Sequence, residues 1–229
     1  MFENIEKCSL CSAPATHSFM NINGREYCRC DRCMATFLNS THWLSPEEEY
    51  AQYQDHKNDL TDRGYRTFLS RLAHPLLKKL TPCRSGLDYG CGPGPVLADI
   101  FSEAGHTVSL FDPYFHPDQS KLDRTYDFIT CTETIEHFHR PAEEFARFER
   151  MLRPGGWLGI MTCFQTEDGR FSSWHYRRDP THVTFYRETT LRFIAAQFGW
   201  SCQIPVKDVA LMQKPLNQSC RKETRIGAP

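Results

Sequence analysis

The sequence predicts an α/β protein with a doubly wound, mostly parallel sheet and a short metal-binding segment in front of it. Two observations predict this. Between residues 86 and 198, short apolar segments alternate with segments of helical period, which is typical of a parallel sheet covered on both faces. In addition, five of the eleven cysteines lie within the first 33 residues, in a stretch too short to bury a core.

The N-terminal cysteines have the spacing of a zinc site. Cys8 and Cys11 form one C-x2-C pair, and Cys30 and Cys33 form another, with 18 residues between the pairs. Four thiolates at such spacing typically bind zinc in a closed tetrahedral site, so we expect a structural zinc that folds a zinc-ribbon-like segment. Cys28 could replace Cys30 as a ligand.

The overall composition excludes several classes of protein. With 27 basic and 28 acidic side chains, the net charge of −1 argues against binding to nucleic acid or membrane through bulk charge. No apolar run approaches the roughly 20 residues that span a bilayer, and the first residues lack the apolar stretch of a signal peptide. We therefore expect a cytoplasmic protein in which the cysteines are reduced.

Each expected element has a local signal. A polar linker over 41–59 contains a helix start at 45–48, and apolar residues recur at helical spacing over 61–80, where Pro75 should kink or break the helix. After this point the expected strands are 86–89, 106–111, 126–131 and 157–162, and the expected helices are 95–104, 141–152 and 188–198.

These elements divide the chain into four parts. We expect a zinc-ribbon-like segment over 1–40, linker and lid helices over 41–82, one α/β domain over 83–213 and a flexible tail over 214–229.

A glycine-rich turn carries the chemistry. Asp88, Gly90, Gly92 and Gly94 occupy every second position where an expected strand turns into an expected helix. This turn lies at the sheet edge where open α/β folds bind ligands. Glycine lets the backbone pass close to a ligand. A dinucleotide-binding turn would place a small residue where Pro95 stands, and the carboxylate of Asp88 would repel a pyrophosphate. The turn therefore favours a cationic ligand.

S-adenosylmethionine is such a ligand, because it carries an ammonium and a sulfonium. Asp112 ends the second strand and is placed to accept hydrogen bonds from ribose hydroxyls. Considered alone, Asp112 is better explained as a turn residue before Pro113. Together with the glycine turn, it favours the cofactor-binding interpretation.

Three segments together resemble the class I S-adenosylmethionine-dependent methyltransferases. They are LDYGCGPG at 87–94, YDFITCTETIEH at 126–137 and LRPGGWLGIM at 152–161, and the resemblance extends over about residues 60–210. It implies a Rossmann-like, seven-stranded sheet whose last strand is antiparallel, with 206–212 as the candidate for that strand. The N-terminal cysteines also resemble those of a bacterial subgroup in which a zinc-ribbon segment precedes a lid over the cofactor.

The resemblance also implies roles for individual residues. Gly90, Cys91, Gly92 and Gly94 would lie against the methionine part of the cofactor, with Asp112 on the ribose. The sulfonium side would be bordered by Thr132 and Glu133. The lid would contribute Tyr53, His56 and Tyr65.

One departure from the family is visible in the sequence. Only 14 residues separate Asp112 from Asp127, where the family usually has a helix, a third strand and an acid that contacts adenine. The link must be abbreviated, with Leu122 in a remnant strand. The adenine contact therefore stays unassigned, with Asp123 as a guess.

The acceptor is less well defined than the cofactor. A base is needed only if the acceptor must lose a proton, and His182 is the preferred candidate, followed by His137, with His175 nearby. Arginines and aromatics alternate over 170–192, which could hold RNA, line a small-molecule pocket or simply cover the sheet. We expect a small-molecule acceptor. The alternatives are an RNA methyltransferase that uses the zinc segment for binding, and a non-catalytic zinc-ribbon module with a methyltransferase-like body.

Overall fold

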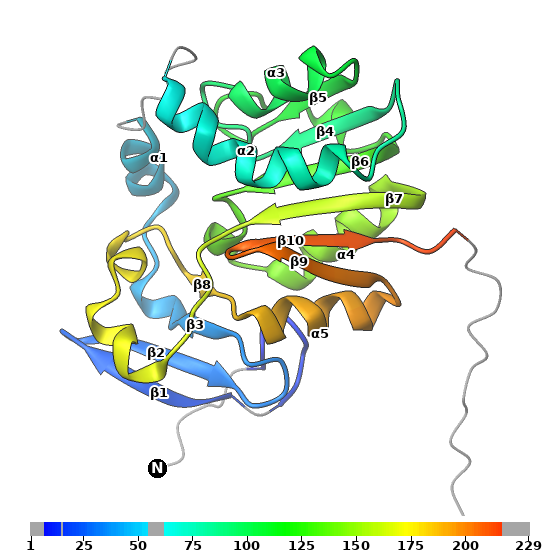
Figure 1. Cartoon of the computed structure of the whole chain (residues 1–229). Helices are drawn as coiled ribbons and strands as arrows, with labels where there is room; N and C mark the ends of the chain where they lie inside the picture. The colour runs from blue at the N-terminus through cyan, green and yellow to red at the C-terminus, as the bar shows by residue number, and fades with distance from the viewer. Residues whose placement is uncertain (1–6, 15, 55–61, 217–229) are drawn as a thin grey trace, which may run out of the picture.

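The computed structural model describes residues 7–14, 16–54 and 62–216, which form two sheets (Figure 1). The larger sheet has the strand order β5-β4-β6-β7-β10-β9. Its pairings from β5 to β7 are parallel, whereas β10 is antiparallel to both of its neighbours. The expectation of a mostly parallel sheet is thus confirmed. The strands are β4 (Ser85–Tyr89), β5 (Thr107–Phe111), β6 (Tyr126–Thr132), β7 (Leu152–Met161), β9 (Ser201–Val206) and β10 (Val209–Gln213).

Helices cover both faces of this sheet, because alternate residues of a strand point to opposite sides. Trp157 and Met161 of β7 pack with α2 and α3, while Leu158 and Ile160 pack with α4 and α5. No helix of the described residues is long and apolar enough to cross a membrane. The helices are α1 (Pro46–Gln54), α2 (Arg63–Leu77), α3 (Val96–Glu103), α4 (Pro141–Met151) and α5 (Glu188–Phe198).

The sheet differs from the expected one in the number of strands. The resemblance implied seven strands, but six form in the described residues. After β5 the chain makes an isolated bridge between Asp112 and His116 and a 3₁₀ helix, η2 (Gln119–Lys121), and Leu122 follows this helix rather than lying in a strand. The 14 residues between Asp112 and Asp127 are too few for the absent strand, since one crossover with its helix requires at least about 10–12 residues and the strand would need a second connection.

The last expected strand is also different. Residues 206–212 were expected as one strand, but β9 ends at Val206 and β10 begins at Val209. Asp208 between them has a φ of +68°, which closes a tight hairpin. β10 therefore lies between β7 and β9, and β9 forms the sheet edge.

Helix α2 continues through Pro75 and ends two residues later. Of the expected kink or break at Pro75, the break is therefore absent, and the proline lies in the last turn. The side chain of Asp62 caps the other end of α2 by accepting hydrogen bonds from the N–H groups of Gly64 and Tyr65.

The N-terminal segment is joined to the main body by strand pairing. Asn23 and Gly24 both have positive φ, as a tight hairpin turn requires, and this turn connects β1 to β2. β3 then pairs with β8, which lies in the loop before α5 (Figure 1). The smaller sheet therefore combines three N-terminal strands with one strand from the loop before α5, namely β1 (Thr16–Ile22), β2 (Arg25–Cys30), β3 (Thr36–Leu38) and β8 (Thr184–Phe185).

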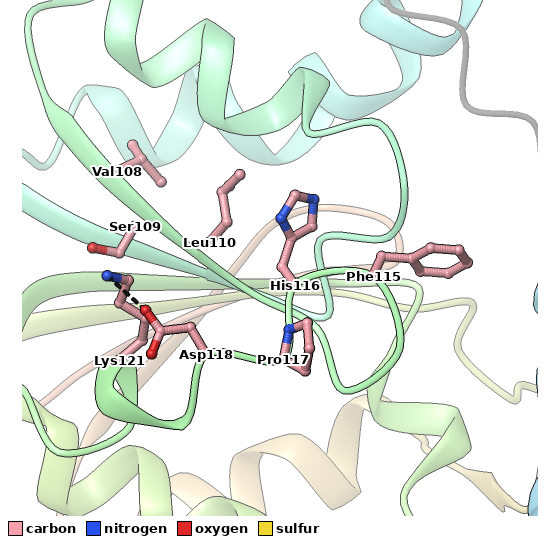
Figure 2. Close-up of a pocket in the computed structure, with 8 residues that line it drawn as sticks. All are labelled: Val108, Ser109, Leu110, Phe115, His116, Pro117, Asp118 and Lys121. Atoms are coloured by element: carbon pink, nitrogen blue, oxygen red, sulfur yellow. Dashed lines mark ion pairs between the residues drawn. The ribbon is translucent and has the colours of Figure 1, made fainter.

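A hollow of about 750 Å³ lies beside the edge strand β5 (Figure 2). The loop after β5 forms its outer wall, where Lys121 and Asp118 make an ion pair of 3.0 Å. Phe115 lines both this hollow and the larger cavity described below. The shortened link thus separates a surface hollow from the candidate site.

Candidate active site

The glycine-rich turn directly follows β4. Gly90 and Gly92 have φ values of +73° and +63°, which glycine adopts without steric cost. The Gly90 N–H donates a hydrogen bond to the carbonyl oxygen of Phe111, at 2.8 Å. A Cβ atom at Gly90 would lie 2.3 Å from Cγ2 of Thr134. Only glycine therefore fits where this turn meets the loop after β6.

Asp112 organises the loop that follows β5. Its Oδ1 accepts hydrogen bonds from the N–H groups of Tyr114 and Phe115, at 2.9 and 3.1 Å. Its Oδ2 accepts one from the N–H of Gly92, at 3.0 Å. The carboxylate thus fixes both the loop and the glycine turn, at the carboxyl ends of two adjacent parallel strands.

A cavity of about 830 Å³ opens over these carboxyl ends. Its volume lies within the range of about 300–1,000 Å³ that is usual for small-molecule sites. The walls combine aromatic rings with more carboxyl groups than arginines, which suits a cationic ligand. Of the residues expected at the cofactor, those in the wall are Tyr65, Gly90, Cys91, Gly92, Asp112, Thr132 and Glu133.

Two of the expected cofactor residues do not line the cavity. Gly94 is not among the residues that line the cavity, and neither is Asp88, which is 3% exposed. The hydroxyl of Thr130 donates a hydrogen bond of 2.8 Å to Oδ1 of Asp88. Burial raises the pKa of Asp88 to about 7, although the Thr130 hydroxyl acts in the opposite direction.

Glu133 is the most perturbed acid of the cavity wall. Burial, followed by the charge of Glu136, raises the pKa of Glu133 to about 9. Its backbone is also unusual, with a φ of +47°, and its N–H donates to the carbonyl oxygen of Met161 at 2.8 Å. Strained backbone and displaced pKa values together are typical of functional sites.

At one side of the cavity, two histidines lie next to each other, with ring centroids 4.7 Å apart. Nδ1 of His137 lies 3.1 Å from the carbonyl oxygen of Thr181, and Nδ1 of His182 lies 2.6 Å from that of Tyr176. A carbonyl oxygen can only accept, so both Nδ1 atoms donate, and in neutral rings both Nε2 atoms keep a lone pair. Burial lowers the pKa of His137, which favours its neutral form.

Helix α1 lies against this side of the cavity. The hydroxyl of Tyr53 is 3.1 Å from Nδ1 of His137, and Oε1 of Glu49 is 3.1 Å from Nε2 of His139. Glu49 also accepts a hydrogen bond from the hydroxyl of Tyr114. The expected lid therefore contacts the cavity through Glu49, Tyr53 and Tyr65, whereas His56 lies outside the described residues.

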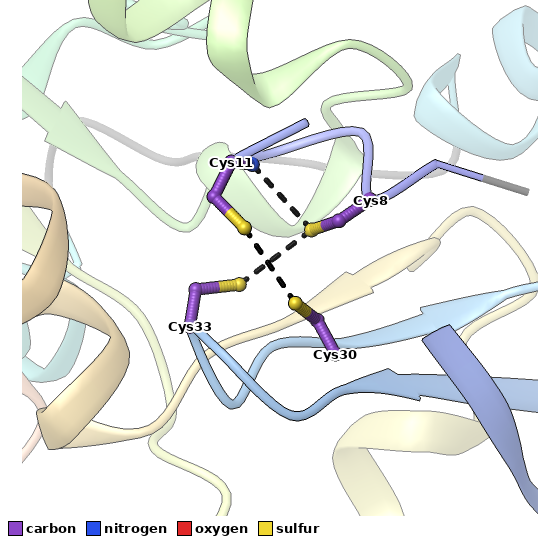
Figure 3. Close-up of side chains that lie close together, drawn as sticks. All are labelled: Cys8, Cys11, Cys30 and Cys33. Atoms are coloured by element: carbon purple, nitrogen blue, oxygen red, sulfur yellow. Dashed lines mark hydrogen bonds between the residues drawn. The ribbon is translucent and has the colours of Figure 1, made fainter. Parts of the chain in front are cut away.

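The four N-terminal cysteines come together as expected (Figure 3). The sulfur atoms of Cys8 and Cys33 are 3.6 Å apart, and those of Cys11 and Cys30 are 3.5 Å apart. Zinc–sulfur bonds of about 2.3 Å in a tetrahedron would place the sulfur atoms about 3.8 Å apart. Cys28 lies outside the cluster, so Cys30 is the fourth member.

Both cysteine pairs have the same backbone turn. In the first, the Ser12 N–H donates to the carbonyl oxygen of Cys8, and in the second the Met34 N–H donates to that of Cys30, each at 2.9 Å. Ser12 and Met34 both have positive φ. The repeated geometry directs all four thiols to one point, so the donor set fits a zinc ion.

Comparison with known proteins decides the family. The family described as "Methyltransferase domain" matches residues 61–203, more than half of the chain. The chain belongs to the class I S-adenosylmethionine-dependent methyltransferases.

The relatives of this methyltransferase are distant. A "Ubiquinone biosynthesis O-methyltransferase" of Thiobacillus denitrificans is 29% identical over 100 residues, and one of Paracidovorax citrulli is 30% identical over 104 residues. These matches cover 33% and 34% of this chain and 43% of each relative, so the chain spans under half of their length.

Two solved structures confirm the fold of the methyltransferase. Magnesium protoporphyrin IX methyltransferase of Synechocystis PCC 6803, with bound S-adenosylhomocysteine, has a TM-score of 0.51 at 13% identity and covers 77% of this chain and 95% of its own. The 1,6-didemethyltoxoflavin-N1-methyltransferase of Burkholderia thailandensis, which also contains S-adenosylhomocysteine, has a TM-score of 0.50 at 16% identity and covers 87% and 99%.

Several residues of the methyltransferase cavity lacked a sequence signal of their own. Asp123, the guess for the adenine contact, is exposed, and the loop after β5 instead contributes Tyr114, Phe115, Gln119 and Leu122. Glu136 could have been found, because it stands between Glu133 and His137 in the fourth-strand motif. Glu49 of α1 could not, since its position in the cavity wall depends on long-range packing.

The arginine and aromatic segment 170–192 packs inward. Phe171, Tyr176 and Phe185 are buried in a cluster with Tyr27, and Arg177 donates hydrogen bonds to the hydroxyl of Tyr27 and to backbone carbonyls. Arg187 pairs with Asp168. The rings of Phe171, Tyr176 and Phe185 are therefore unavailable for stacking on nucleobases, which supports their interpretation as cover of the methyltransferase body.

The buried carboxyl of Asp88 should make stability depend on pH. Because its pKa in the folded protein is about 7 and its ordinary value is 3.8, folding favours the protonated form, and stability is lost as pH rises from about 4 to about 7. Asp88→Asn removes this term. Between pH 5.5 and pH 7 we expect the parent to lose about 2 kcal/mol more unfolding free energy than Asp88→Asn loses.

Urea unfolding of the ligand-free proteins at several pH values measures this difference. Asp123→Asn, which alters an exposed carboxyl, provides the control. A difference between Asp88→Asn and the parent that stays constant over this pH range would contradict the prediction.

Proposed function

We propose that this methyltransferase acts on a small molecule and methylates a hydroxyl oxygen. The observation that carries the proposal is the cavity of about 830 Å³, which is covered by α1 and contains the two histidines on one side. A cavity of this size can hold S-adenosylmethionine and a small acceptor. The names of the curated relatives, which are O-methyltransferases, support the same acceptor atom.

In this proposal the glycine turn and the loop after β5 hold the cofactor. Gly90, Cys91 and Gly92 give the methionine part a wall without large side chains, and Asp112 faces the ribose. Thr132 and Glu133 border the sulfonium, and Tyr65 covers it from α2. When bound, S-adenosylmethionine supplies a methyl group on a positively charged sulfur. The acidic wall favours that charge, with Asp88 acting from behind the turn.

The two histidines activate the acceptor. An alcohol or phenol is a weak nucleophile until its proton is withdrawn. Nε2 of His182 and Nε2 of His137 carry the lone pairs that face this part of the cavity. The aromatic rings of Tyr53, Tyr114 and Phe138 line the same cavity, which suits an acceptor with a planar ring.

Labelled cofactor tests this function. We expect the purified full-length chain, incubated with S-[methyl-³H]adenosylmethionine and a size-fractionated cell extract, to transfer label into the low-molecular-weight fraction. Ribonuclease treatment of the extract should leave this transfer unchanged. Label found only in RNA would contradict the small-molecule proposal. If S-adenosylhomocysteine binds in calorimetry but no fraction is labelled, the non-catalytic module is favoured.

The same proposal includes a structural zinc on Cys8, Cys11, Cys30 and Cys33. Four thiolates complete a tetrahedron and leave no open position for chemistry. The cluster is part of the hydrophobic core that also contains Tyr186 and residues of α5. The zinc would therefore hold the N-terminal segment against the body, near the loop that supplies His182.

A further inference from the structure

A second cluster of metal-binding side chains lies at the acceptor side of the cavity. One ligand atom from each of Glu136, His137 and His182 lies within 4.8 Å of the others. We infer that these three residues bind a divalent cation, which in turn holds the acceptor hydroxyl. This inference rests on the proposed function and specifies how the two histidines would activate the acceptor, namely through a bound cation.

Glu136 is the first argument for the cation. The residue is 0% exposed, and its Oε2 accepts a hydrogen bond of 2.9 Å from the hydroxyl of Thr162. Its Oε1 is buried without a hydrogen-bond partner in the described residues and lies 3.9 Å from Nε2 of His137. A buried carboxylate oxygen without a partner costs free energy, and a bound cation would remove that cost.

The orientation of the histidines is the second argument. Both Nδ1 atoms donate to backbone carbonyls, which leaves each Nε2 as an acceptor. Nε2 of His137 lies 3.9 Å from Oε1 of Glu136, and Nε2 of His182 lies 3.8 Å from Oδ2 of Asp179, which also lines the cavity. Metal-bound histidines are usually fixed in this way, by a hydrogen bond from the other ring nitrogen. Two imidazole lone pairs and the carboxylates of Glu136 and Asp179 thus lie close together, and a positive charge between them would stabilise this arrangement.

The donor set indicates the class of cation and of acceptor. Two imidazoles and one carboxylate suit Mn²⁺, Fe²⁺, Co²⁺ or Zn²⁺, whereas Ca²⁺ prefers oxygen ligands alone. Three protein ligands leave coordination positions open toward the cavity, which all three residues line. An acceptor with two adjacent oxygens could occupy these positions. The cation would lower the pKa of the bound hydroxyl, and the released proton would pass to solvent.

Titration with Mn²⁺, followed by electron paramagnetic resonance, tests the site in the full-length, zinc-loaded chain with S-adenosylhomocysteine added. Mn²⁺ prefers oxygen and nitrogen ligands, so the cysteine cluster does not compete. We expect one Mn²⁺ per chain. Glu136→Gln, which can still accept the hydrogen bond from Thr162, and His182→Gln should each weaken binding at least tenfold. His175→Gln changes an exposed histidine outside the cavity and should leave Mn²⁺ affinity unchanged.

Binding of S-adenosylhomocysteine by each variant, measured by calorimetry, separates loss of the cation from loss of the fold. Mn²⁺ affinity that is the same in the parent, Glu136→Gln and His182→Gln would overturn the inference. So would full activity of the parent after chelation of the bound cation. Mn²⁺ binding that depends on Glu136, in a chain that methylates no hydroxyl, would support the site and reject only the proposed acceptor.

Discussion

Replacing Gly90 by alanine is expected to lower the affinity for S-adenosylhomocysteine more than 100-fold. The added methyl group would lie 2.3 Å from the side chain of Thr134, which is itself held by a hydrogen bond to the carbonyl oxygen of Gly90. The turn would have to move away from the loop after β6, and its φ of +73° adds strain for any residue with a Cβ. Isothermal titration calorimetry measures the loss directly.

A matched variant separates the steric effect from the backbone effect. Gly105 has a φ of +85°, but a Cβ there meets nothing within 4 Å. Gly105→Ala should therefore cost about 1 kcal/mol of stability, as alanine does in a left-handed position, and leave the affinity for S-adenosylhomocysteine unchanged. If Gly90→Ala and Gly105→Ala bind equally well, the turn is not part of the cofactor site.

Replacing Cys30 by serine should have the largest effect on the N-terminal segment. We expect the parent to contain one zinc per chain, measured by plasma mass spectrometry, and the variant to contain none. Zinc binding by small folded segments is worth roughly 10–16 kcal/mol, so its loss should unfold the segment. Amide hydrogen exchange should then become fast in residues 16–38, and the temperature of unfolding of the whole chain should fall.

Cys28→Ser is the control for this experiment. Cys28 lies two residues away on the same strand but outside the cluster. It should keep the zinc and the protection from hydrogen exchange. If Cys28→Ser loses the zinc and Cys30→Ser keeps it, Cys28 is the ligand in place of Cys30. If the parent and both variants contain no zinc, the prediction of a structural metal is wrong.

The parts of the fold that depend on local pattern could be predicted from the sequence. The period of α5 and the start of α1 at Pro46 follow from side chains within a few residues of each other. The two cysteine pairs and the glycine turn depend on short spacings as well. The four cysteines of the two pairs therefore came together as expected, whereas the spacing left the choice between Cys28 and Cys30 open and the structure places Cys30 in the cluster.

The parts that depend on distant contacts could not be predicted. The predicted strand over 206–212 is interrupted by a hairpin turn, because Asp208 takes a left-handed conformation that no glycine in this segment indicates. The six-stranded sheet reflects the short link after β5, which the sequence showed as a departure but whose path it left open. The approach of α1 to His137 likewise depends on the folding of segments far apart in the chain.

The pairing of β3 with β8 has a consequence for synthesis of the chain. Thr36 is aligned with Phe185, so the edge of the N-terminal sheet gains its partner only after nearly 150 further residues have been made. At typical rates of about 5–20 residues per second, that interval lasts roughly 7–30 seconds. During this time β3 is an unprotected strand edge, which can pair with other nascent chains. Early capture of a metal ion by the cysteines would keep this edge folded until its partner leaves the ribosome.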